Sequence, residues 1–313
     1  MIPETSETRR TRAPVSPFPA AGSAGSIPCV YGLCGISIPH MIPVAASSMF
    51  FHEYPVDEIF DAVEEAGLDG IEFWLETPHF WLQGLPAEDL EAAIRSHPRI
   101  PSIQIHAPVL DLNPCSINPD VAEASRRWAV AAVELAERVG APVVTVHPGK
   151  RTAKRAPMAD DFRRFARYLA VLREAAAGHR VRVAMENVEP VVNAMISTPE
   201  EARALLDRED WLSFTLDMSH AMNHSERMLT RFVETFGDRL VNVHVSRAAD
   251  GVMHLPLEGD TVIGEALAAI ARGGYDGPLT LEIEDRNLDH DLSLEEKIQL
   301  LAGEAAFLRG CVR

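Results

Sequence analysis

The chain has 313 residues, 47% of them hydrophobic, and its 46 Asp and Glu against 29 Lys and Arg give a formal net charge of −17. This length suits one (β/α)8 barrel of about 250 residues with an extension. The acidity disfavours non-specific binding to nucleic acid, and no apolar run is long enough to span a membrane. The four cysteines show no C-x-x-C spacing, which indicates free thiols in a reducing compartment.

Residues 1–28 are rich in Pro, Ser, Ala and Arg and lack hydrophobic periodicity, so we expect a disordered tail. Arg9-Arg10 matches the start of a twin-arginine signal, but no apolar segment follows and three prolines interrupt the stretch. We therefore expect a cytoplasmic protein whose residues 29–313 form a single domain.

Short β-like runs then alternate with helix-like stretches. A first strand is expected within 34–39, followed by an irregular segment to about Tyr54. The next expected elements are a helix at 56–66, a strand at 70–75, a helix at 86–96, a strand at 102–107, a helix at 119–139, a strand at 142–147 and a helix at 160–177.

The second half of the chain continues the alternation. Thr198 and Glu201 form a capping-box pattern around Pro199, which predicts a helix that begins at Ser197 or Thr198. The other expected elements are strands at 181–186, 213–217, 240–246 and 279–284 and a last helix at 294–309. Strands that alternate with helices imply βαβ units and a parallel sheet, so the predicted fold class is α/β, a single (β/α)8 TIM barrel.

Seven of the β-like runs contain, at or near their ends, a residue that binds metal well: Glu72, His106, His147, Glu186, Asp217, His244 and Glu282. In a parallel barrel all strands point the same way, so their last residues meet at the end where such barrels hold active sites. Within the runs, apolar residues alternate with polar ones, as in Val241, Asn242, Val243 and His244. We expect the polar face to point to the barrel axis, where buried carboxylates are costly unless they are paired or bind metal.

Glu186, Asp217, His244 and Glu282 therefore form the predicted metal site. Three carboxylates and one imidazole suit Mn²⁺, Zn²⁺, Mg²⁺ or Co²⁺ rather than a thiolate-type structural zinc site. His106 and His147 could join Glu186, as a bridging ligand, to hold a second ion, so one or two divalent ions per chain are expected. For Glu72 an ion pair inside the barrel is the favoured interpretation. His220 and His254 are expected in loops, which makes them weaker candidates.

The order of HAPVLDLN, VVTVHPGK, AMENVEP, FTLDMSHA, NVHVS, HLPLEGD and LEIE resembles the xylose-isomerase-like TIM-barrel superfamily over about residues 33–310. That superfamily joins sugar-phosphate isomerases and epimerases with endonuclease IV-type nucleases. The resemblance implies that Glu186, Asp217, His244 and Glu282 are the epimerase-type ligands, and that Glu186 and Glu282 also act as acid and base. It implies further zinc ligands in His106 and His147, and contact of His220 with substrate or with a third zinc.

The chain also departs from the nuclease pattern. The nucleases carry Asp-x-His before a G-E-G segment, whereas Asp250 here precedes His254 by a longer stretch. Val109 stands where the nucleases insert a tyrosine into DNA. Ketose epimerases hold substrate with an arginine that follows the histidine corresponding to His244. The nearest arginine after His244 here is Arg247, at a different offset. Lys150 begins a basic loop, and we include it with His220, His254 and Arg247 as a candidate substrate-binding residue.

The leading hypothesis is a divalent-metal-dependent isomerase or epimerase. It would act on a small sugar-like molecule (a sugar, sugar phosphate or related polyol) through an enediolate, with Glu186, Glu282 and His220 as catalytic residues. The alternatives are an endonuclease IV-like zinc phosphodiesterase at abasic DNA, or another metal-dependent hydrolase or lyase. The acidic balance and Val109 disfavour the nuclease.

Overall fold

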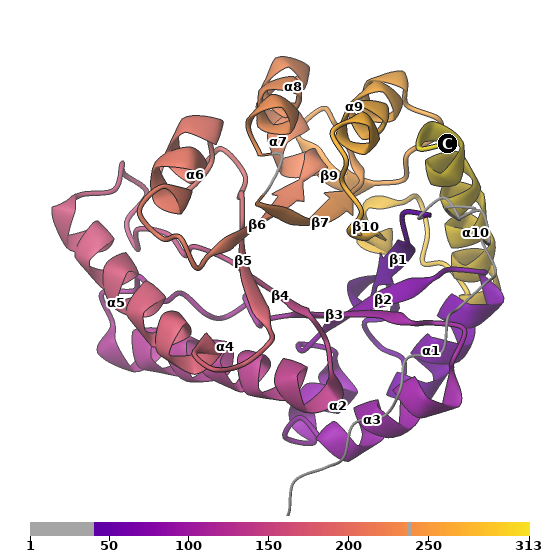
Figure 1. The fold of residues 1–313 in the computed structure, drawn as a ribbon, viewed down its shortest axis with the longest axis horizontal. Helices are drawn as coiled ribbons and strands as arrows, with labels where there is room; N and C mark the ends of the chain where they lie inside the picture. The colour runs from indigo at the N-terminus through magenta and orange to yellow at the C-terminus, as the bar shows by residue number, and fades with distance from the viewer. Residues whose placement is uncertain (1–40, 237–238) are drawn as a thin grey trace, which may run out of the picture. The chain divides into compact units, whose positions relative to one another are not determined.

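The computed structural model describes residues 41–236 and 239–313, which form a closed barrel surrounded by helices (Figure 1). Eight strands close it in the order β1-β10-β7-β6-β5-β4-β3-β2, and all neighbouring pairs are parallel. The α/β class and the TIM barrel predicted from the alternation of strands and helices are therefore confirmed. The expected tail at 1–28 lies outside the described residues.

The barrel strands are β1 (Val44–Ser47), β2 (Gly70–Trp74), β3 (Ser102–His106), β4 (Val143–Val146), β5 (Arg182–Glu186), β6 (Ser213–Asp217), β7 (Leu240–Val245) and β10 (Leu279–Leu281). The helices are α1 (Val56–Glu65), α2 (Pro78–Leu82), α3 (Ala87–Ser96), α4 (Pro119–Val139), α5 (Ala159–Ala176), α6 (Pro199–Leu206), α7 (Met218–His224), α8 (Glu226–Thr235), α9 (Thr261–Arg272) and α10 (Leu294–Cys311). Short 3-10 turns η1 (Ser48–Phe51) and η2 (Asp285–Asn287) follow β1 and β10, and β8 (Arg247–Ala249) pairs with β9 (Val252–Leu255) as an antiparallel hairpin.

The predicted strand parity is correct, and the barrel axis is lined by hydrogen-bonded polar side chains. Asn242 from β7 donates to Glu72 of β2 at 2.7 Å and to the Thr145 hydroxyl of β4 at 3.3 Å, and it accepts from Thr280 of β10 at 2.9 Å. These contacts join four strands across the barrel interior and offset part of the cost of burying their polar groups.

The apolar residues of the same strands face outward and pack under the helices as one large core. Ile105 of β3 and Val243 of β7 are fully buried there. Phe214 of β6 stacks on Phe236, with ring centroids 4.4 Å apart, and this pair fixes the end of α8 against the sheet. Because the core lies outside the barrel wall, the interior remains free for chemistry at the carboxyl ends of the strands.

Three expectations about elements need correction. The first barrel strand is β1 at Val44–Ser47, inside the segment expected to be irregular, whereas the predicted strand at 34–39 lies outside the described residues. His220 belongs to helix α7 and His254 to strand β9, so neither lies in a loop. Strand β1 is only four residues long and carries no metal-binding residue, which explains why the repeating pattern did not reveal it.

The capping box at α6 is confirmed. Thr198 accepts a hydrogen bond from the backbone N–H of Glu201, and the Glu201 carboxylate accepts from the backbone N–H of Thr198. In the part of the chain that the structure describes, no helix is long and apolar enough to cross a membrane.

Candidate metal centre

All seven strand-end residues singled out in the sequence lie at the same end of the barrel or on its axis. Glu186 and Asp217 close β5 and β6, and His147 and Glu282 directly follow β4 and β10. Their side chains converge with those of His106 and His244, and the resulting cluster is almost entirely buried, with Glu186 1% and His244 0% exposed.

Glu186, Asp217, His244 and Glu282 form the first group of potential ligands, and one atom from each lies within 4.8 Å of the others. The distances from His244 Nδ1 are 2.9 Å to Glu282 Oε2, 3.5 Å to Glu186 Oε1 and 3.8 Å to Asp217 Oδ2. Two donors that each lie about 2.1 Å from one ion at a right angle are about 3 Å apart. The spacing therefore matches side chains that surround a common divalent ion.

Three polar atoms of this group lack a hydrogen-bond partner although they are buried: Asp217 Oδ2, His244 Nδ1 and Glu282 Oε2. Buried polar atoms are normally satisfied, and an unpaired carboxylate oxygen in a protein interior is costly. All three face the same small space, so a cation there would satisfy them together. The donor set thus fits a divalent ion on the geometry of the chain itself.

His244 is oriented for this task by contacts on its other nitrogen. Its Nε2 lies 2.8 Å from Glu72 Oε2, which assigns the Nε2 proton to that hydrogen bond and leaves the Nδ1 lone pair toward Glu282. A carboxylate that accepts a hydrogen bond from the second nitrogen of a metal-binding histidine fixes the tautomer of the ring and raises the basicity of the nitrogen that binds metal. The ion pair expected for Glu72 is present, and its partner is a candidate ligand.

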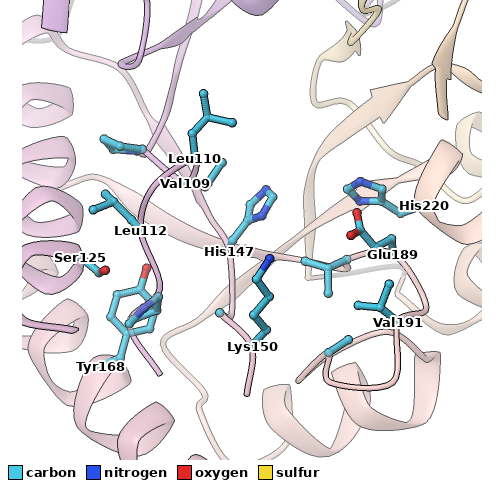
Figure 2. A pocket seen from close by; sticks show the side chains of 15 residues that line it. Val109, Leu110, Leu112, Ser125, His147, Lys150, Tyr168, Glu189, Val191 and His220 are labelled. Atoms are coloured by element: carbon cyan, nitrogen blue, oxygen red, sulfur yellow. The ribbon is translucent and has the colours of Figure 1, made fainter. Parts of the chain in front are cut away.

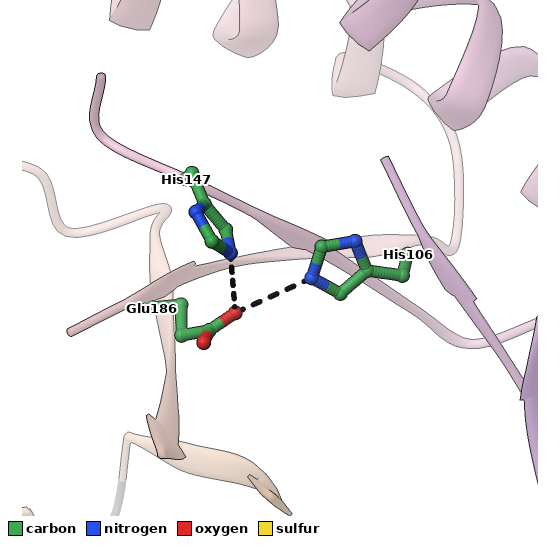
Figure 3. Close-up of side chains that lie close together, drawn as sticks. All are labelled: His106, His147 and Glu186. Atoms are coloured by element: carbon green, nitrogen blue, oxygen red, sulfur yellow. Dashed lines mark hydrogen bonds and ion pairs between the residues drawn. The ribbon is translucent and has the colours of Figure 1, made fainter. Parts of the chain in front are cut away.

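His106, His147 and Glu186 form a second group, as predicted (Figure 3). Glu186 Oε2 lies 3.0 Å from His147 Nε2 and 3.4 Å from His106 Nε2, whereas Glu186 Oε1 faces the first group. One carboxylate thus offers an oxygen to each group, which is the arrangement of a bridging ligand.

Asp217, His220 and His254 form a third group within the same 4.8 Å limit. The longer spacing between Asp250 and His254 does not remove His254 from the site, because the β8–β9 hairpin folds it back over the barrel mouth. His254 has a left-handed backbone, with φ of 56°, which is uncommon for a residue with a side chain. Such backbone strain clusters at functional sites and supports a ligand role for His254.

Three other histidines of the centre are also held by their second nitrogen. Nδ1 of His106 lies 2.8 Å from the Ala107 carbonyl, Nδ1 of His220 2.9 Å from the Asn187 carbonyl, and Nδ1 of His254 3.2 Å from the Glu282 carbonyl. A carbonyl can only accept, so each Nδ1 carries the proton and each Nε2 is free to bind. This repeated arrangement prepares the rings for coordination.

The charges in the centre balance one another. Burial opposes the charged form of His244, but Glu282, Glu72 and Glu186 outweigh it and raise its pKa well above the usual value. Burial likewise opposes ionisation of Glu186, yet His147 and His244 lower the pKa of its carboxyl well below the ordinary range. Protonated imidazoles and carboxylates therefore compensate each other, and a metal ion would take the place of those protons.

Of the candidate substrate-binding residues, Lys150 lines a cavity next to the metal centre, whereas Arg247 is engaged in contacts within the β8–β9 hairpin. Lys150 lies beside His147, His220 and Glu189 on the wall of a cavity of about 270 Å³ next to the centre (Figure 2). Arg247 lies in the hairpin instead, where its Nε donates to the Pro256 carbonyl at 3.1 Å and its Nη2 pairs with a glutamate at 2.7 Å.

Two residues near the centre were not singled out in the sequence. Asn187 is buried and pins the backbone of Asp217, because its amide donates to the Asp217 carbonyl and its carbonyl accepts from the Asp217 N–H, both at 2.9 Å. Glu76 accepts the backbone N–H groups of Val109 and Leu110 at 2.7 and 2.8 Å and so holds the loop after β3. Neither residue follows the strand-end pattern, so only contacts between distant segments reveal them.

Known proteins share this architecture. The family described as xylose isomerase-like TIM barrel matches residues 60–310. An uncharacterised protein of Methanocaldococcus jannaschii is 32% identical over 275 residues, which make up 87% of this chain and 100% of the relative.

Two solved structures share the fold. An L-ribulose 3-epimerase superposes with a TM-score of 0.70 and 20% identity, over 87% of this chain and 95% of that one. A D-tagatose 3-epimerase-like protein gives a TM-score of 0.67 and 21% identity, over 87% of this chain and 100% of that one. At these sequence identities the two structures establish the fold alone. The family is established by the family match, which covers residues 60–310. The chain therefore belongs to the xylose isomerase-like TIM barrel family.

Proposed function

We propose that this enzyme is a divalent-metal-dependent isomerase or epimerase that acts on a sugar, sugar phosphate or related polyol. The observation that carries the proposal is the pair of buried carboxylates, Glu186 and Glu282, which lie 3.5 and 2.9 Å from His244 Nδ1 in one ligand group. A reaction that removes a proton from one face of a carbon and returns a proton to the other face can use two such groups, one as base and one as acid.

A divalent ion held by Glu186, Asp217, His244 and Glu282 would supply a Lewis acid, which acidifies the C–H next to a substrate carbonyl. Glu186 or Glu282 would remove that proton, and the other carboxylate would return it, from the opposite face when the product is an epimer. His220 Nδ1 lies 3.4 Å from Glu186 Oε1, so the ring of His220 lies beside one of the two proposed bases.

The neighbouring structures support this assignment. The two reported above are named as an L-ribulose 3-epimerase and a D-tagatose 3-epimerase-like protein, and another is a 3-keto-D-glucoside 4-epimerase from E. coli. All of these names describe or imply epimerisation of a sugar. Mn²⁺, Zn²⁺, Mg²⁺ and Co²⁺ all suit the oxygen-rich ligand group proposed here.

Deuterium incorporation tests the proposal. The enzyme with Mn²⁺ and a pool of ketoses, aldoses and their phosphates in D₂O should place deuterium beside the carbonyl of one sugar, because the abstracted proton can exchange with water. Glu282→Gln should abolish the label, since an amide cannot act as the base. Mass spectrometry of the sugar pool gives the result. The absence of label from every sugar, with metal tightly bound, would exclude proton transfer as the reaction.

A second function is favoured by a specific observation, namely the three adjoining ligand groups that share Glu186 and Asp217. Several ions at short distances suit hydrolysis of a phosphodiester, as in the endonuclease IV-type alternative, or another metal-dependent hydrolase or lyase reaction. A nicking assay on a duplex with one abasic site, in Zn²⁺ or Mn²⁺, distinguishes them. We expect no cleavage, because Val109 cannot act as a base-stacking wedge. Cleavage that His106→Ala abolishes would assign the nuclease function instead.

A further inference from the structure

The cavity beside the metal centre, which we call the lateral cavity, combines an apolar wall with charged and polar side chains. Its volume is about 270 Å³. Apolar side chains from the loops after β3 and β5 line about half of it, among them Val109, Leu112 and Val191. Its polar lining includes His147 and His220 of the metal centre (Figure 2). A cavity of about 150 Å³ holds a benzene ring, so this volume accommodates a ring-sized apolar group.

Lys150 introduces a positive charge at this apolar wall, and its backbone is held in place. Asn113 donates to the Lys150 carbonyl at 2.8 Å and accepts from its N–H at 3.0 Å, and Lys150 bridges Ala194 in the loop after β5. The neighbouring Arg151 pairs with Asp161, whereas Lys150 pairs with no carboxylate of the described residues. Lys150 is exposed and Glu189 lines the same cavity, but no described carboxylate pairs with the ammonium group, which favours an anionic ligand.

Tyr168 of α5 adds a hydrogen-bond donor to the wall of the lateral cavity. Its side chain is 3% exposed, it lines the lateral cavity, and its hydroxyl points toward Leu112 on the same wall (Figure 2). Burial raises its pKa, so the hydroxyl stays a neutral donor, and no group among the residues described hydrogen-bonds to it. The hydroxyl is therefore available to donate a hydrogen bond to a polar group of a molecule bound in the cavity.

We propose that the lateral cavity binds the apolar substituent of an anionic, sugar-like substrate, and that Lys150 pairs with the anionic group beside the metal centre. This inference rests on the proposed function and narrows its substrate class: a free polyol would leave the apolar wall and Lys150 unused. The reacting part of the substrate then lies at His147 and His220, and the apolar part lies against Val109, Leu112 and Val191.

Equilibrium binding to the metal-loaded enzyme tests this assignment without turnover. Phenyl phosphate, which carries an anion and a ring, should bind about tenfold more tightly than inorganic phosphate by calorimetry. Val191→Asn should remove most of that difference, because an amide at the wall disfavours the ring. Lys150→Ala should weaken both probes by roughly tenfold, through loss of a charge-assisted contact.

Matched variants provide the controls. Val192→Asn changes the adjacent, 61% exposed valine, and Lys154→Ala changes another lysine of the same loop; neither residue lines the cavity. Both should bind the probes as the unsubstituted enzyme does. Equal affinity for the two probes, equal effects of a variant and its control, or no measurable binding of phenyl phosphate would overturn the proposal. A preference for phenyl phosphate without deuterium exchange would refute the proposed reaction and leave the cavity assignment standing.

Discussion

Glu72 determines which nitrogen of His244 faces the metal centre, although 172 positions separate them in the chain. We expect Glu72→Gln to lower the affinity for a divalent ion by about 10- to 100-fold, because the amide accepts the Nε2 proton less strongly and no longer holds the ring. Competition with a coloured chelator measures the affinity, and circular dichroism should show an unchanged fold.

Asp61 and His97 offer a matched control for that substitution. They form a similar carboxylate–histidine contact at 2.9 Å, away from the metal centre. Asp61→Asn should therefore leave metal affinity unchanged. If the two variants bound metal equally well, the orienting role of Glu72 would be wrong.

Strands β2 and β3 approach each other so closely at Gly70 that a side chain has no room. A Cβ atom there would lie 2.5 Å from the Ser102 carbonyl oxygen and 2.7 Å from the Ser102 Cβ. Because the obstacle includes backbone, Gly70→Ala should destabilise the barrel by about 1–3 kcal/mol, a typical effect of overpacking. Urea unfolding followed by fluorescence gives the change in the free energy of unfolding.

Gly303 in α10 provides the opposite case. A Cβ atom there would meet nothing within 4 Å. Gly303→Ala should stabilise the protein by about 0.5–1 kcal/mol, because alanine loses less backbone entropy than glycine when a helix forms. Equal effects of the two substitutions would contradict the close approach of β2 and β3.

The barrel as a whole concentrates opposite charges at one end. We therefore expect its stability to change with pH in one direction in the metal-free protein and in the other direction, or not at all, in the metal-bound protein. Burial alone would lower the pKa of His220, but Asp217 and Glu186 raise it to about 10. A histidine with a raised pKa in the folded state stabilises the fold fully below the unfolded value of 6.5, and this stabilisation is lost as pH rises toward 10. The urea midpoint of the metal-free protein should therefore fall between about pH 6.5 and 9.

With saturating Zn²⁺ the midpoint should instead hold or rise over the same range, because ions bind only the deprotonated imidazoles and compete better as proton concentration drops. In metal-free His220→Gln the decline should be smaller, whereas His224→Gln, at an exposed position, should retain it. A metal-free midpoint that rises with pH would show that the histidines are not held protonated.

Local patterns in the sequence determined the fold and most of the candidate ligands. Alternation along a run such as Ile103 to His106 reports which face of a strand is apolar, and the return of such runs after helix-length stretches specifies a parallel barrel. Since parallel strands end at one face, the strand-end residues Glu186, Asp217 and Glu282 could be assigned to one site before any contact was known.

Tertiary structure decided what depends on contacts between distant segments. The third group forms because a hairpin with a left-handed backbone at His254 returns to Asp217 and His220, and no periodicity encodes that path. The protonated nitrogen of each histidine follows from its hydrogen-bond partner, as with Glu72 and His244. Strand β1, four residues long and without a metal-binding residue, became visible only through its pairing with β2 and β10. Side-chain periodicity is a local property of the chain, whereas ring orientation, loop paths and short strands depend on long-range packing.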